Sequence, residues 1–214
     1  MNKPILLFLL ILVCSVSNAQ IKALTENGKQ VILYDNGTWK YETDSVTKSK
    51  SSDSIKLNNN KFSKPIGATF LVKSSVLNIG AYIDPNVWTF AGHHENEVNP
   101  EFRFTLKSDD GAAMLITEKT QIALESMPDI ALINAQKASL DARITYKDYR
   151  IVNNKKVLFL QMAGTIKGIH FRYTGYYYSS EKGTVQIVCY TSENLYEHAK
   201  KDMENFLNGF VVLE

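Results

Sequence analysis

A histidine-rich segment is the first place in this sequence where residue types and spacing could support metal chemistry. It contains His93, His94, Glu95 and Glu97, and imidazole nitrogens and carboxylate oxygens are ligands for zinc, nickel or copper. Zincin metalloproteases, however, need a second histidine four residues after the first, and that position after His94 is Val98. Neighbouring residues of an extended segment also point to opposite sides, so the two histidines would not easily share one ion. A solvated polar loop is the favoured interpretation, and a metal site is the alternative.

A tyrosine-rich segment later in the chain could support the recognition of a ligand. Every second side chain of a strand lies on one face, which here holds His170, Arg172, Thr174, Tyr176 and Tyr178. Arginine and tyrosine together provide contact area and hydrogen bonds, and both are frequent at binding sites. Tyrosine is also favoured in strands for packing alone, and a helix could cover this face, so a structural role is the commoner explanation. The candidate ligand-binding residues are His170, Arg172, Tyr176 and Tyr178.

The common catalytic motifs are missing from the sequence. It contains no glycine-rich phosphate loop, no Gly-x-Ser-x-Gly elbow and no Cys-x-x-Cys pair. Cys189 lies in the apolar run 185–190 with no cationic neighbour, so we expect a buried hydrophobe rather than a reactive thiol. We therefore assign no catalytic residue and expect no cofactor.

Residues 1–19 have the features of a secretory signal peptide: a basic start, the apolar run Ile5–Val13 and a small-residue end before Gln20. A lipoprotein anchored through Cys14 is the alternative, but Val13 stands where such signals usually carry a small residue. No later segment approaches about 18 consecutive apolar residues, so we expect no transmembrane span. The expected location is outside the cytoplasm, either periplasmic or secreted.

The composition predicts a folded chain with balanced charge. Hydrophobic residues make up 44% and charged residues 21% of the 214 residues, which is typical of globular proteins. The 24 lysines and arginines nearly match the 22 acidic residues. This balance gives no electrostatic reason to expect nucleic acid as a partner.

Two Asn-Gly turns at residues 27–28 and 36–37 predict a three-stranded β-meander over residues 20–42. Such a small sheet cannot bury enough surface alone, so it must dock on something. Its sequence pattern resembles a short N-terminal module of exported Bacteroidota proteins, which implies a source and a compartment but no activity. Residues 43–61 are rich in Ser, Lys, Asp and Asn, which predicts a flexible linker.

Residues 62–214 should form the main domain. We expect early strands at 68–73, 76–83, 102–107 and 112–118, a helical region at 120–141 interrupted at Pro128, strands at 142–152, 156–167, 169–180 and 184–191, and a last helix at 192–208. Short separators predict antiparallel pairing of the four later strands. The second and fourth of these are apolar on both faces, which predicts helices covering the sheet.

This order of elements is similar to that of the PsbP-like family, which includes DcrB-type envelope proteins. The likeness covers about Phe62 to Glu214 and is carried by the segment from Tyr82-Ile83-Asp84-Pro85 to Trp88, the long hairpin from Val157 to Tyr178, and the strand and helix ending at Phe210. The resemblance implies an α+β fold with a central antiparallel sheet and helices packed on its faces, a PsbP-like sandwich, preceded here by the small meander. It does not imply catalysis.

These observations favour an exported, non-enzymatic binding or accessory protein of the bacterial envelope, with an envelope protein as the expected partner. The alternative is a metal-assisted hydrolase using His93, His94 and Glu95. The sequence leaves the ligand and the oligomeric state open.

Overall fold

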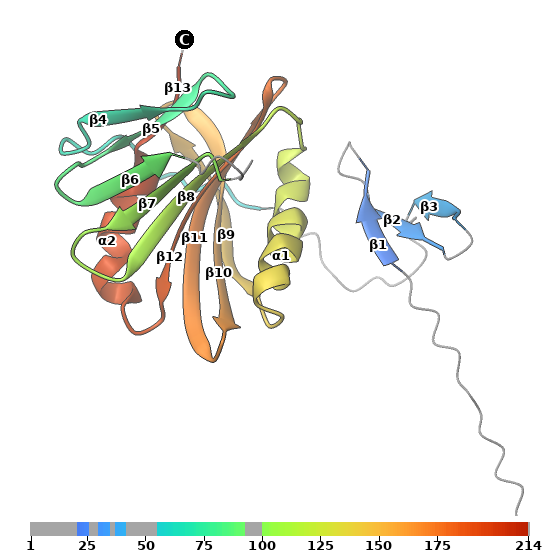
Figure 1. The fold of residues 1–214 in the computed structure, drawn as a ribbon. Helices are drawn as coiled ribbons and strands as arrows, with labels where there is room; N and C mark the ends of the chain where they lie inside the picture. The colour runs from blue at the N-terminus through green and yellow to red at the C-terminus, as the bar shows by residue number, and fades with distance from the viewer. Residues whose placement is uncertain (1–20, 26–29, 35–36, 42–54, 93–99, 214) are drawn as a thin grey trace, which may run out of the picture.

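One seven-stranded antiparallel sheet dominates the architecture (Figure 1). The computed structural model describes residues 21–25, 30–34, 37–41, 55–92 and 100–213. From one edge to the other, the large sheet consists of β6 (Trp88–Gly92), β7 (Phe102–Leu106), β8 (Gly111–Glu118), β12 (Gly183–Ser192), β11 (Ile169–Ser180), β10 (Lys155–Ile166) and β9 (Arg143–Val152). The strands from β9 to β12 are joined by tight turns. Asn153 and Asn154 both adopt positive φ, 46° and 65°, which is the backbone geometry of a type I′ hairpin turn. The predicted antiparallel run is thus confirmed.

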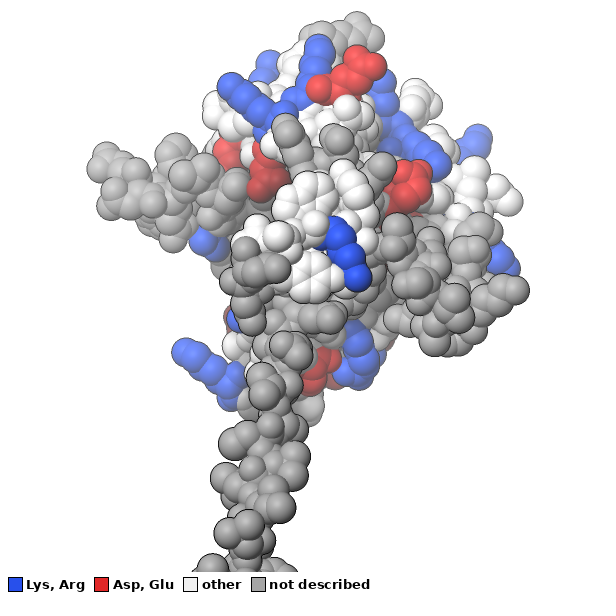
Figure 2. Space-filling view, turned by 90° about the vertical axis from the view of Figure 1, so that its right-hand side faces the viewer, with Lys and Arg blue, Asp and Glu red and all other residues white. Residues whose placement is uncertain are grey.

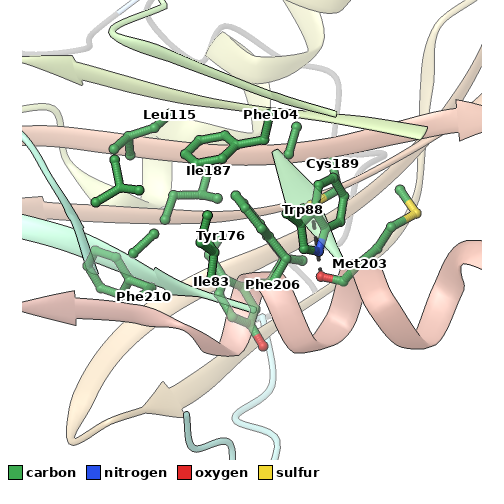
Figure 3. Packing of buried hydrophobic residues seen from close by; sticks show 14 of the residues in the cluster. Ile83, Trp88, Phe104, Leu115, Tyr176, Ile187, Cys189, Met203, Phe206 and Phe210 are labelled. Carbon is green, nitrogen blue, oxygen red and sulfur yellow. Dashed lines mark hydrogen bonds between the residues drawn. The ribbon is translucent and has the colours of Figure 1, made fainter. Parts of the chain in front are cut away.

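One face of the large sheet carries the larger hydrophobic cluster. It packs against α2 (Tyr196–Asn208) and a small sheet formed by β4 (Phe70–Lys73), β5 (Ile79–Ile83) and β13 (Phe210–Val212). Figure 3 shows Phe206 of α2 beside Ile83 of β5 in this cluster. The ring centroids of Trp88 and Phe104 each lie 4.7 Å from that of Phe206. Aromatic contacts therefore help to hold α2 against the sheet.

The opposite face of the sheet is covered by α1 (Met127–Ala138), which follows a single 3-10 turn, η1 (Leu124–Ser126). Met127 and Ala131 of the helix join a second buried cluster with Leu158, Leu160 and Tyr177 of the sheet. Helices thus cover both faces, as the apolar pattern of β10 and β12 predicts.

Helix boundaries and short strands differ from the sequence expectations. Helix α1 begins only at Met127, because Pro128 is accommodated in its first turn, where no backbone donor is lost. Helix α2 begins at Tyr196 rather than Ser192, because Ser192 still pairs with Phe171 at the end of β12. Strands β6 and β13 were not expected from the sequence.

Residues 55–62 pack along β9 at the edge of the large sheet. The backbone of Asn58 donates to the carbonyl of Tyr149 at 2.7 Å, and Tyr149 donates back to Lys56 at 2.8 Å. A parallel bridge joins Phe62 to Val152. The ordered structure therefore extends upstream of the expected start at residue 62. The part of the 43–61 linker before residue 55 lies outside the described residues and stays a prediction.

Three short strands precede this segment: β1 (Ile21–Leu24), β2 (Gln30–Leu33) and β3 (Trp39–Tyr41). They pair antiparallel in sequence order. On β3, Trp39 and Tyr41 contact each other edge to face at 5.2 Å between ring centroids, and both are exposed. The interpretation of residues 20–42 as a separate docking module stays a prediction.

Glu101 connects the turn between β4 and β5 to the large sheet through hydrogen bonds. Its buried carboxylate accepts hydrogen bonds from the hydroxyls of Ser74, Ser75 and Thr117 and from the backbone N–H of Ser75. Burial alone would raise the pKa of Glu101, but the donors from Thr117, Ser74 and Ser75 outweigh it, and the pKa is lowered. The charged form is therefore the one that the fold stabilises.

Candidate functional site

The four candidate ligand-binding residues of β11 separate into two pairs. Tyr176 is 2% exposed and lies in the core near Ile83 and Phe206 (Figure 3), and Tyr178 packs on Phe210 with 5.4 Å between ring centroids. Both tyrosines therefore serve packing in this structure. His170 and Arg172, at the other end of β11, line a surface hollow instead.

This hollow, called the Arg172 hollow below, has a volume of about 200 Å³. Its lining residues are Asp141, Arg143, Thr145, Ala163, Gly164, His170, Phe171, Arg172 and Glu193. Strand register explains the cavity, because Arg143 of β9 and Arg172 of β11 both pair with Ala163 of β10. The two arginines are thus one strand apart on either side of a methyl group, which leaves room between them.

Arg172 is fixed in place by Glu193. Its Nε donates to one carboxylate oxygen at 2.5 Å and its Nη2 to the other at 2.8 Å, which is a bidentate ion pair. The guanidinium also lies 5.4 Å from the ring centroid of Tyr196. The hydrogen bond from Arg172 lowers the pKa of Glu193, and the bond to Glu193 raises the pKa of Arg172. This pair forms a rigid wall of the hollow.

Asp141 and His170 form another part of the lining and are connected through Thr165. The Asp141 carboxylate accepts from the hydroxyl and backbone N–H of Thr165 and from the hydroxyl of Ser139, and these bonds lower its pKa to about 2. The Thr165 hydroxyl lies 3.0 Å from Nδ1 of His170. Because that hydroxyl donates its proton to Asp141, Nδ1 must be the donor. The geometry thus places a proton on Nδ1 of His170.

The hollow can hold an acidic group from outside. Arg143 is exposed and makes no hydrogen bond or salt bridge within the described part of the chain, and its charge helps to lower the pKa of Glu193. Its N–H donors are therefore available to a carboxylate that enters between it and Arg172. Among the described residues, no serine or cysteine lines the hollow, and its one hydroxyl side chain is that of Thr145.

The predicted metal ligands His93, His94, Glu95 and Glu97 lie outside the described residues. Within the described ranges, no group of three or more histidine, cysteine or acidic side chains could hold a metal ion. Cys189 is buried, and burial raises the pKa of its thiol well above the usual value. No helix of the described residues is long and apolar enough to cross a membrane.

Arg150 is the polar residue that the sequence interpretation missed. Its position on β9 suggests an ordinary solvent-facing residue, yet its side chain is only 12% exposed. Its guanidinium carbon lies 3.4 Å from the ring centroid of Phe159 and 4.6 Å from that of Phe62. Phe62 comes from the segment along β9, so no pattern within β9 itself could reveal this environment.

Comparisons with known proteins support the fold. No family model and no curated protein matches the sequence. Among solved structures, the chain is similar to cyanobacterial PsbP (CyanoP) from Synechocystis sp. PCC 6803, with 12% identity and a TM-score of 0.51 over 69% of this chain and 94% of that one. A structure from Bacteroides thetaiotaomicron VPI-5482 gives 11% identity and a TM-score of 0.42 over 69% of this chain and 49% of that one. A Pseudomonas aeruginosa protein of unknown function has 8% identity and a TM-score of 0.42, over 68% of this chain and 97% of that one. The likeness to cyanobacterial PsbP confirms the expected PsbP-like fold, without the N-terminal meander.

Proposed function

We propose that this chain is an exported, non-enzymatic binding or accessory protein of the bacterial envelope, and that its Arg172 hollow holds an acidic side chain of a protein partner. The observation that supports this proposal is the exposed Arg143, which makes no hydrogen bond or salt bridge within the described part of the chain and lies one strand away from Arg172, itself paired with Glu193. Asp141 and Glu193 also line the hollow and balance the two arginines, so the site suits a single carboxylate better than a polyanion.

The surface charges agree with a protein partner. On the face shown in Figure 2, basic and acidic side chains of the described residues are interspersed. Nucleic-acid binding depends on clustered lysines and arginines that neutralise several phosphates together. A surface with mixed charges is better suited to a protein partner than to nucleic acid.

The test is native mass spectrometry of the protein isolated from its own cell envelope, comparing wild type with Arg143→Glu. The proposal predicts a partner chain bound to the wild type and its loss in the variant, because the new carboxylate repels an acidic group. Lys147→Glu is the matched control, since Lys147 is also an exposed cation of β9 but does not line the hollow. Equal partner binding by both variants would contradict the role of the hollow.

The same spectra test the compartment and the enzyme alternative. An exported protein cleaved at the expected site has a mature chain beginning at Gln20, whereas a chain retaining residues 1–19 would contradict export by cleavage. A stoichiometric transition metal that is lost on replacing His93 and His94 with alanine would contradict the non-enzymatic proposal and favour the metal-assisted hydrolase.

A further inference from the structure

A second cavity, separate from the Arg172 hollow, lies where the segment along β9 meets α2. It has a volume of about 240 Å³ and is lined by Asn58, Asn60, Phe62, Arg150, Glu204 and Asn208. Three amides, one cation, one carboxylate and one phenyl ring from three different parts of the chain therefore surround one space. Its size is below that of sites for drug-sized ligands, so its occupant must be small.

The cation of this cavity, Arg150, is held rigidly but keeps unused donors. Its Nε donates to the buried carboxylate of Asp148 at 2.9 Å. One Nη1 contact to the hydroxyl of Tyr176 is long, at 3.4 Å. Arginine has five N–H donors, so most of those on Nη1 and Nη2 remain available. The rings of Phe62 and Phe159 cover part of the guanidinium. A ligand can therefore bind Arg150 only by accepting hydrogen bonds from its N–H groups.

Asp148 does not consume these remaining donors, because its own oxygens are occupied. One oxygen accepts from the side-chain amide of Asn58 at 2.8 Å and from the hydroxyl of Tyr146 at 3.1 Å, and the other accepts from Nε of Arg150. Such a buried pair, in which each carboxylate oxygen accepts at least one hydrogen bond, is a stable support for the cation. A carboxylate that enters the cavity can therefore bind Arg150 without displacing Asp148.

The carboxylate of Glu204 sets the second requirement for the ligand. Glu204 is exposed on α2, lines the same cavity and has no hydrogen-bond or salt-bridge partner among the described residues. It would repel a bare anion beside Arg150. A ligand with an ammonium group near its carboxylate turns this repulsion into a second ion pair. Within the described part of the chain, the side-chain amide nitrogen of Asn208 donates to no acceptor, so it offers a further donor, while its Oδ1 accepts from the hydroxyl of Tyr176 at 2.8 Å.

From this arrangement we infer that the cavity binds a small zwitterion of the free α-amino-acid class, with its carboxylate on Arg150 and its ammonium on Glu204. The inference is independent of the partner proposed for the Arg172 hollow, because the two cavities share no lining residue. Charge neutrality of the bound state and the two separated ion pairs give the site its selectivity.

Isothermal titration of the full chain with glycine, L-alanine and L-leucine, each to about 10 mM, tests the inference. At least one should bind with a Kd of about 1 mM or tighter, and acetate and ethylammonium should each bind at least about tenfold more weakly. No binding by any of the three amino acids overturns the inference. Acetate binding as tightly as the amino acid overturns the role of Glu204 and, with it, the zwitterion.

Variants locate the bound molecule. Glu204→Gln should weaken binding at least about tenfold, because it removes one charge-assisted contact. Glu197→Gln is the matched control, since Glu197 is an exposed glutamate of the same helix that does not line the cavity. Arg150→Lys keeps a cation beside Asp148 and should also bind at least about tenfold more weakly, because lysine lacks the planar fork. Unchanged binding in Glu204→Gln, or equal losses in both glutamate variants, overturns the assignment.

Discussion

Replacing Glu101 by glutamine should destabilise the protein by roughly 3 kcal/mol at pH 7. The carboxylate accepts from three hydroxyls and one backbone N–H, and a hydrogen bond to a charged group contributes roughly 1.5–3 kcal/mol. Glutamine keeps one acceptor oxygen but places an amide donor against hydroxyls that already donate. The bonds are not independent of one another, so the expected loss is nearer to one or two of them than to all four.

The pH dependence of this difference is the sharper test. Because the folded-state pKa of Glu101 is lowered from 4.5, its contribution is fully present above about pH 4.5 and is lost as the pH falls through the folded-state pKa. Other acidic groups titrate identically in both proteins. The difference in unfolding free energy between wild type and Glu101→Gln should therefore shrink below about pH 4.5.

Urea unfolding curves recorded from pH 7 to pH 3 measure this difference directly. Glu118→Gln is the control, because Glu118 also lies on the large sheet but its side chain makes no hydrogen bond within the described part of the chain. A difference below about 0.5 kcal/mol at pH 7, or one that stays constant down to pH 3, would contradict this role of the Glu101 carboxylate.

Two further predictions concern close packing. In Gly164→Ala the new Cβ would lie 2.2 Å from the hydroxyl oxygen of Ser139 and 3.1 Å from the Cα of Ala142. We expect a loss of roughly 1–3 kcal/mol in urea unfolding, and an unchanged midpoint would argue against this contact. Burial raises the pKa of the Cys189 thiol, so a disulfide reagent should modify it in denaturant but not in the native protein at pH 8. Rapid native labelling would show that the thiol is accessible.

The sheet order from β9 to β12 could be predicted because tight turns and continuous apolar strands are local signals. Strands β6 and β13 could not, since each is short and is defined by pairing with β7 or β5 rather than by its own pattern. Likewise, Ser192 looks like a helix cap in isolation, but pairing with Phe171 keeps it in β12. Long-range pairing overrides local preference at these positions.

In the candidate site, too, local patterns could be predicted but long-range contacts could not. Alternation along β11 correctly groups His170 with Arg172 on one face, but it cannot show that α2 and β13 cover the tyrosine end. The environment of Arg150 depends on Phe62, which is distant in sequence. A lone arginine in a strand gives no signal of such a neighbour.

The segment 55–62 also affects whether the domain can self-associate through an open sheet edge. Strand β9 is the last strand of the large sheet, and an open strand edge is a template for pairing with another chain. The bonds of Lys56 and Asn58 to Tyr149 occupy part of that edge. A domain shortened to begin at Phe62 would lose this cover and expose backbone groups able to recruit a second molecule. Residues 55–61, which have the composition of a flexible linker, therefore protect the sheet from self-association.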